Sequence, residues 1–123
     1  MALTLNNLGA IYHDLQQLKE SEAALDEAFQ IYRELTKSNP SAYQSETADT
    51  FNNLATVYHD TQPLEESEAA FNEALLIRRE LANSNPSAYQ PKLAATLSNL
   101  AAVYYETQQL KESEAGFREA LQI

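Results

Sequence analysis

A period of 46 residues runs through the whole chain and limits what it can fold into. Asn7, Asn53 and Asn99 mark the period, since 53 − 7 and 99 − 53 both equal 46, and no insertion is needed to keep the register. The repeated text reads LNNLGAIYHDLQQLKESEAAL, FNNLATVYHDTQPLEESEAAF and LSNLAAVYYETQQLKESEAGF. A fixed period of this size is typical of a solenoid, in which each unit buries its apolar face only against its neighbours.

Each unit reads as two helices. The apolar residues recur at steps of three and four, which places them on one stripe of a helix. In the second unit these residues are Phe51, Leu54, Val57 and Tyr58, followed by Leu64, Phe71, Ala74, Leu75 and Leu81. Pro63 suits the first turn of a helix, and Pro91 stands where a new helix can begin. The expected helices span residues 2–15, 18–38, 45–61, 64–84, 91–107 and 110–123.

The linker between units is the heptapeptide SNPSAYQ, which occurs at 38–44 and again at 84–90. The residue before a proline avoids the helical region, so the preceding helix should end before Pro40 and Pro86. Tyr43 and Tyr89 are expected to pack the start of the next helix onto the helix before it. We therefore expect one array, with units at 1–44, 45–90 and 91–123, the last of them truncated.

Composition excludes several classes of function. The chain has 123 residues, with 18 acids against 8 basic residues and a formal net charge of −10, so its field repels phosphate backbones and anionic lipid. We expect no nucleic-acid partner and no membrane association, and a protein partner that is neutral or basic. Cysteine is absent, which removes disulfides, thiolate zinc sites and cysteine nucleophiles and fits a cytoplasmic protein. No signal peptide is visible and no cofactor is expected.

The residue spacing within a unit resembles the tetratricopeptide repeat family. In the second unit a Leu, a small residue and a Tyr on the first helix precede a small residue, a large apolar residue and an Ala on the second. These positions are Leu8, Gly9, Tyr12, Ser21, Leu25 and Ala28; Leu54, Ala55, Tyr58, Ser67, Phe71 and Ala74; and Leu100, Ala101, Tyr104, Ser113, Phe117 and Ala120. The long units look most similar to those of kinesin light chain. The place of the family's early tryptophan holds Leu5, Phe51 and Leu97 instead, and the closing proline comes late.

The resemblance implies a fold and a function. The fold would be all-α, a right-handed α-solenoid of three helix-turn-helix repeats with six antiparallel helices. The function would be that of a non-enzymatic protein–protein interaction scaffold, which binds a peptide segment in a concave groove lined by the first helix of each repeat.

Small residues are expected where the two helices of a unit approach most closely. Gly9, Ala55 and Ala101 should face Ala28, Ala74 and Ala120 and let the helix axes come within roughly 8–10 Å. The serines Ser21, Ser67 and Ser113 are expected to bond to a carbonyl one turn earlier in their own helix. No acid–base partner accompanies them, so catalysis by serine is disfavoured.

The residues left over on the first helices are mostly amides and acids, and they are the candidate ligand-binding positions. They are Asn6, Asn7, His13 and Asp14; Asn52, Asn53, Thr56, His59 and Asp60; and Ser98, Asn99, Ala102, Tyr105 and Glu106. The asparagine of each unit offers a donor and an acceptor, which suits the backbone of an extended peptide. The alternative is that each asparagine ties down the preceding linker or helix end.

Two other interpretations stay open. The repeated YHD text at 12–14 and 58–60 could hold a metal ion through His13, His59 and their aspartates, although the third unit reads YYE. The chain could also be an architectural spacer or a self-assembly element. The last helix offers Phe117, Leu121 and Ile123 with no further helix to cover them, which predicts self-association through the open ends of the solenoid.

Overall fold

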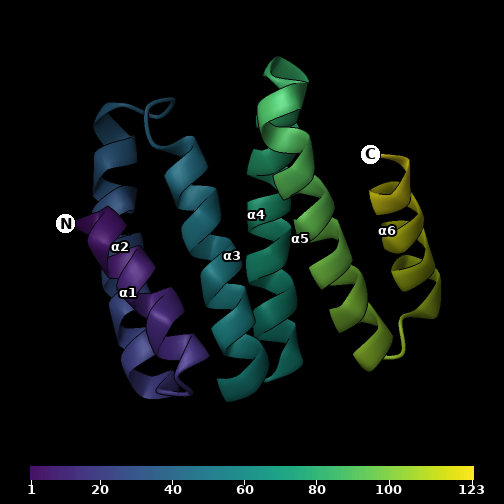
Figure 1. The fold of residues 1–123 in the computed structure, drawn as a ribbon, viewed down its shortest axis with the longest axis horizontal. Coiled ribbons are helices and arrows are strands. Elements are labelled where there is room, and N and C mark those ends of the chain that lie inside the picture. Colours follow the sequence, from purple (N-terminus) through teal and green to yellow (C-terminus); the bar gives the residue numbers. More distant parts are fainter.

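The computed structural model describes all 123 residues and consists of six α-helices that pack one after another (Figure 1). The helices are α1 (Ala2–Asp14), α2 (Leu18–Ser38), α3 (Gln44–Thr61), α4 (Leu64–Ser84), α5 (Pro86–Glu106) and α6 (Leu110–Gln122). Each helix contacts the next in the chain, and α1 also contacts α3. The expected α-solenoid of antiparallel helix pairs is confirmed. No helix is long and apolar enough to cross a membrane.

The start of α5 differs from the expectation. The predicted bounds agree with the structure to within one residue elsewhere, but α5 begins at Pro86 and contains Pro91. The first copy of the same heptapeptide forms a turn at 39–43, so its fold depends on its surroundings. Tyr43 packs against the Tyr32 ring of α2, with ring centroids 6.2 Å apart. Arg78 occupies the position equivalent to Tyr32 in the next pair, and the second copy is helical from Pro86 onward.

Both linker tyrosines pack as expected. Tyr43 contacts α2 through Tyr32, and Tyr89 packs against the buried cluster of Ala82, Leu93 and Leu97. The first turn of each following pair is therefore held on the preceding second helix.

The buried serines bond differently from the prediction. Ser21, Ser67 and Ser113 each donate through Oγ to a carbonyl oxygen of the first helix in the same pair, at 2.6, 2.8 and 2.8 Å. The acceptors are the small residues Gly9, Ala55 and Ala101. A bond within the serine's own helix was the wrong expectation, because the small residue opposite brings the neighbouring helix's carbonyl within reach.

The pairing of small residues also differs. A Cβ placed on Gly116 would lie 3.0 Å from the Ala101 Cβ, so these two residues meet at the α5–α6 contact. Gly9 lies against Leu25 in the same way. Ala120 instead packs near Leu97, one turn before Ala101. The closest partners are thus three to four residues nearer the start of the second helix than expected, because antiparallel helices pair around the connecting turn.

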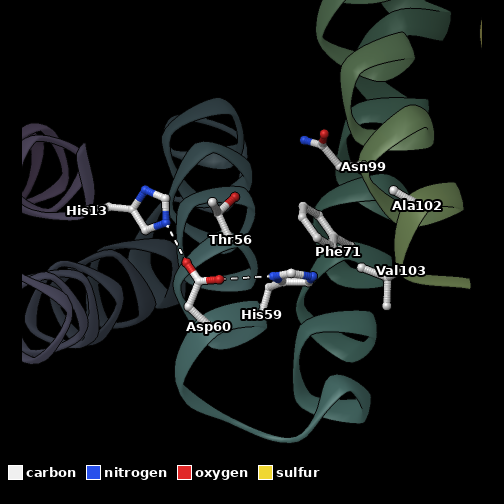
Figure 2. Close-up of a pocket in the computed structure, with 8 residues that line it drawn as sticks. All are labelled: His13, Thr56, His59, Asp60, Phe71, Asn99, Ala102 and Val103. Carbon is white, nitrogen blue, oxygen red and sulfur yellow. Dashed lines mark hydrogen bonds and ion pairs between the residues drawn. The ribbon is translucent and has the colours of Figure 1, made fainter. Parts of the chain in front are cut away.

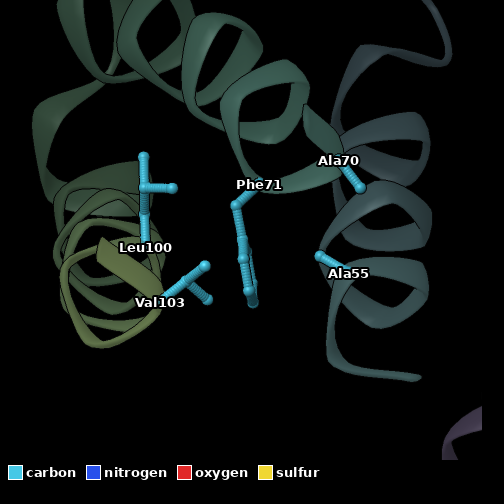
Figure 3. Packing of buried hydrophobic residues seen from close by; sticks show 5 residues of the cluster. All are labelled: Ala55, Ala70, Phe71, Leu100 and Val103. Carbon is cyan, nitrogen blue, oxygen red and sulfur yellow. The ribbon is translucent and has the colours of Figure 1, made fainter. Parts of the chain in front are cut away.

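Successive pairs share one apolar seam. Phe71 of α4 stands between Ala55 of α3 and the side chains of Leu100 and Val103 on α5 (Figure 3). Leu25 fills the equivalent place between α1 and α3, where it packs with Leu54 and Val57. These second-helix side chains lie beneath the junctions between first helices.

Candidate functional site

The first helices of the three pairs, α1, α3 and α5, are joined side by side by polar contacts, and we call the surface that they form the first-helix face. Asn53 Nδ2 donates to Asn6 Oδ1 (3.1 Å) between α3 and α1. Thr96 Oγ1 donates to Asn52 Oδ1 (3.3 Å) between α5 and α3. Asn6 is buried, and Asn52 and Asn53 are half-buried. These three candidate residues hold neighbouring helices together.

The three repeated asparagines differ in what they bond. Asn53 is tied to α1 through Asn6. Asn7 and Asn99 are exposed and their side chains make no hydrogen bond within the chain. The same residue at equivalent positions therefore contributes to packing in one pair and presents a free amide in the other two.

A ladder of histidines and carboxylates crosses the first-helix face near the ends of the helices. His13 Nε2 lies 3.1 Å from Asp60 Oδ2, and His59 Nδ1 lies 3.1 Å from Asp60 Oδ1 (Figure 2). His59 Nε2 lies 2.7 Å from Glu106 Oε2. Each histidine thus contacts the acid of the following first helix. The repeat supplies these contacts because an acid follows the histidine position in each unit, as Asp14, Asp60 and Glu106.

The ladder favours charged forms. The hydrogen bond to Asp60, and then the contacts with Glu106, raise the pKa of His59 above 6.5. His59, followed by His13, holds the pKa of Asp60 below its usual 3.8. With carboxylates at both ring nitrogens, the imidazolium form of His59 can donate on both sides.

The metal interpretation gains no support from this geometry. No group of three or more His, Asp or Glu side chains is arranged to hold a metal ion. The ring nitrogens of His13 and His59 face carboxylates instead. The histidines are paired with acids across helices, which is an electrostatic role.

The remaining candidate residues lie on the same face in different environments. The Asp14 side chain is 84% exposed and lies 3.9 Å from the His13 Nδ1 atom. Tyr105 is exposed beside Glu106. Thr56 is half-buried, and its hydroxyl donates to Asn52 O (3.0 Å) within α3. The Thr56 hydroxyl proton is therefore bonded within its own helix.

Two hollows open on the first-helix face, one at each junction. The α1–α3 hollow has a volume of about 140 Å³, and the α3–α5 hollow has a volume of about 280 Å³. Seven lining residues of the first have their equivalents, 46 residues later, in the second. The pairs are Ala10 and Thr56, His13 and His59, Asp14 and Asp60, Leu25 and Phe71, Asn53 and Asn99, Thr56 and Ala102, and Val57 and Val103. The hollow is therefore a repeated feature of the face.

The two hollows differ in size and in what lies at their rims. Phe71 takes the place of Leu25 beneath the α3–α5 hollow, where its ring stands between the two helices. Ala102 takes the place of Thr56 on the wall. The Asn99 amide is free at this hollow, whereas Asn53 at the smaller one is bonded to α1. On the opposite wall Thr56 takes the place of Ala10, so the two wall changes offset each other and the larger side chain below, Phe71 in place of Leu25, is the change that accompanies the larger hollow.

The candidate list missed a polar cluster at the other end of α3 and α5. Arg78 of α4 is buried, and it donates through Nη1 to Thr96 Oγ1 (2.6 Å) and through Nη2 to Asp49 Oδ1 (2.8 Å). Lys92 Nζ lies 3.4 Å from the same Asp49 oxygen. The sequence signal was a break in the period, because Arg78 aligns with Tyr32. Phe71, at the floor of the larger hollow, was assigned to the core alone.

Comparison with known proteins agrees with this architecture. A family model described as "Tetratricopeptide repeat" matches residues 46–123, and a second model with the same description matches residues 1–40. The chain belongs to the tetratricopeptide repeat family. The resemblance based on residue spacing is confirmed.

A solved structure has the same fold. The chain is similar to the crystal structure of BtubC (BKLC) from P. vanneervenii, with a TM-score of 0.82 and 25% sequence identity. The similarity covers 98% of this chain and 45% of that one, so the chain spans less than half the length of BtubC. No curated protein matches the chain. Tetratricopeptide repeat domains typically mediate protein–protein interactions and are usually non-catalytic.

Proposed function

We propose that the chain is a non-enzymatic interaction module that binds a peptide segment of a protein partner in the groove along its first-helix face. The observation that carries the proposal is the free Asn99 amide beside the α3–α5 hollow. An amide donates and accepts at once, which matches the backbone of an extended peptide. The adjacent hollow supplies apolar surface to bury. Family membership supports the general role of protein binding.

The test uses peptides selected from a displayed random-sequence library against the intact chain. A selected peptide should lose about 1 kcal/mol of binding free energy to Asn99→Ala, the net worth of one hydrogen bond, while the melting temperature stays the same. Isothermal titration calorimetry measures the affinity.

Asn53→Ala is the matched control, because this asparagine is bonded to buried Asn6. It should lower the melting temperature, since it leaves a buried acceptor without its donor. A selected peptide that shifts NMR signals only of α2, α4 and α6 would contradict the proposed groove.

Self-assembly is a second candidate, and the outer face of α6 favours it. Phe117 is 42% exposed and Leu121 is 87% exposed, whereas Phe71, the equivalent of Phe117, is only 3% exposed beneath α5. A hollow of about 480 Å³ opens beside Phe117 and Leu121. We expect the mass measured by light scattering to rise with concentration and Leu121→Glu to return the chain to a monomer. A wild type that stays monomeric at high concentration would rule out this candidate.

A further inference from the structure

The α3–α5 hollow is built to accept one side chain. Its volume of about 280 Å³ lies just below the roughly 300–1,000 Å³ of pockets that enclose whole small-molecule ligands. Its apolar lining comes from Phe71, Ala102 and Val103, and Phe71 points into it from below (Figure 2). The polar residues, Asn99 on one side and His59 with Asp60 on the other, stand around these apolar groups. An apolar side chain can therefore be buried while its backbone stays beside polar groups.

The charge of the first-helix face selects the residues that flank the apolar side chain. The first helices carry five carboxylates, Asp14, Glu46, Asp49, Asp60 and Glu106, against Lys92 and the two histidines that pair with Asp60 and Glu106, so acids remain in excess. Lys92 already faces Asp49. A peptide with lysine or arginine on either side of its apolar residue matches this field, and an acidic peptide is repelled.

The unequal volumes of the two hollows determine which residue of a bound peptide can face each of them. Neighbouring first helices stand on the order of 10 Å apart, which an extended peptide spans in about three residues. The α1–α3 hollow has half the volume of the other, about 140 Å³ against 280 Å³. A side chain that fills the larger hollow cannot fit the smaller one without displacing its walls.

From these observations we propose that the first-helix face recognises a basic peptide segment by one large apolar side chain in the α3–α5 hollow, with a small residue about three positions away over the α1–α3 hollow. This inference rests on the proposed function and names the chemistry of its ligand. An aromatic anchor fits well, because it can pack at an offset or edge-on against the Phe71 ring.

The experiment uses short synthetic peptides with a lysine–serine background that differ only in one central residue, which is Phe, Leu or Ala. Fluorescence anisotropy measures the dissociation constant of each peptide for the intact chain. The Phe peptide should bind about tenfold or more tightly than the Ala peptide, as expected for burying a large apolar side chain. The same anchor in a glutamate–serine background should bind much more weakly.

Two alanines at equivalent positions provide a matched pair of variants. Ala102 lines only the larger hollow and Ala10 only the smaller one, and they lie two periods of 46 residues apart. Ala102→Leu fills the larger hollow and should abolish the preference for Phe. Ala10→Leu should leave that preference intact. Melting temperatures establish that both variants are folded.

The outcomes separate this inference from the proposed function. Peptides that bind through Asn99 but show no preference for an apolar anchor would overturn the inference, and so would peptides that keep this preference in Ala102→Leu. Either result would leave the proposed function intact. Equal preference loss in both leucine variants would also overturn it. If peptides from the random library and the lysine–serine set all fail to shift the NMR signals of Asn99 and Ala102, the proposed function fails as well.

Discussion

Replacing each of the three buried serines by alanine tests which carbonyl its hydroxyl bonds. The substitution should destabilise the fold if the hydroxyl joins two helices, and should be neutral or slightly stabilising if it bonds within its own helix. Ser67 is fully buried, and its Oγ donates to Ala55 O on the neighbouring helix at 2.8 Å. Ser67→Ala removes this bond but leaves the Ala55 carbonyl with its own partner in the α3 ladder. The loss is about 1 kcal/mol for the hydrogen bond, and alanine returns up to about 0.5 kcal/mol of helix propensity. The net cost should be about 0.5–1 kcal/mol.

Thermal unfolding followed by circular dichroism measures this cost. For a chain of this size the melting temperature should fall by about 2–5 °C. The same change at Ser21 and Ser113 should add, because the three sites share no partner, so the triple variant should lose about 1.5–3 kcal/mol.

Ser84→Ala is the control on the same helix. Its Oγ lies 3.4 Å from Glu80 O, one turn earlier in α4, and it is exposed. Removing a bond of this kind is neutral or slightly stabilising, because a serine bonded to its own helix weakens that helix. If Ser67→Ala and Ser84→Ala shift the melting temperature equally, Ser67 does not join the two helices.

Two further predictions concern the core and the histidine ladder. Ala74→Leu should cost about 1–3 kcal/mol of unfolding free energy, because it overpacks a fully buried position. Glu66→Leu on the exposed side of α4 should cost little. Equal losses in urea denaturation would mean that the buried face of α4 is assigned to the wrong residues. Because the pKa of His59 is raised above 6.5, its imidazolium stabilises the fold fully below that pH, and this contribution is lost as pH rises through the raised pKa. The urea midpoint of His59→Gln should therefore differ most from that of the wild type below about pH 6.5, and a difference that is independent of pH would argue against the ion pair.

The fold was accessible from the sequence because the period, the apolar spacing and the prolines all agree. Ala55 and Ala74 were expected in the core, and both are fully buried. The start of α5 was not accessible, because identical heptapeptides form a turn at 39–43 in the first copy and a helix from Pro86 in the second. The residues around the two copies differ, since Tyr32 and Ser45 at the first correspond to Arg78 and Pro91 at the second. The heptapeptide alone therefore does not determine which structure forms.

The sequence predicted which helix face carries the candidate site, but not how the residues on that face pair. The period places amides and acids on the first helices, and the structure confirms that these helices adjoin. The period of 46 does not predict which residues pair. Partners across helices lie 47 residues apart, as in Asn6–Asn53, His13–Asp60 and His59–Glu106. The extra residue comes from the way neighbouring helices are offset. The size of each hollow likewise depends on side chains of the second helices below.

One departure from the period, Arg78 in the place of Tyr32, accompanies the difference between the two junctions. By the offset of the other pairs, Asn99 is expected to bond Asn52, but in the structure Thr96 donates to that oxygen and Asn99 makes no side-chain hydrogen bond. Thr96 can do so because Arg78 donates to its hydroxyl oxygen and leaves the hydroxyl proton for Asn52. At the first junction Tyr32 replaces Arg78, and the equivalent Thr50 donates to Glu46 O in its own helix. Asn6 accepts from Asn53 there, which ties the Asn53 amide to α1. The buried arginine thus lies beneath the junction at which the Asn99 amide is free, beside the larger hollow where the peptide site is proposed.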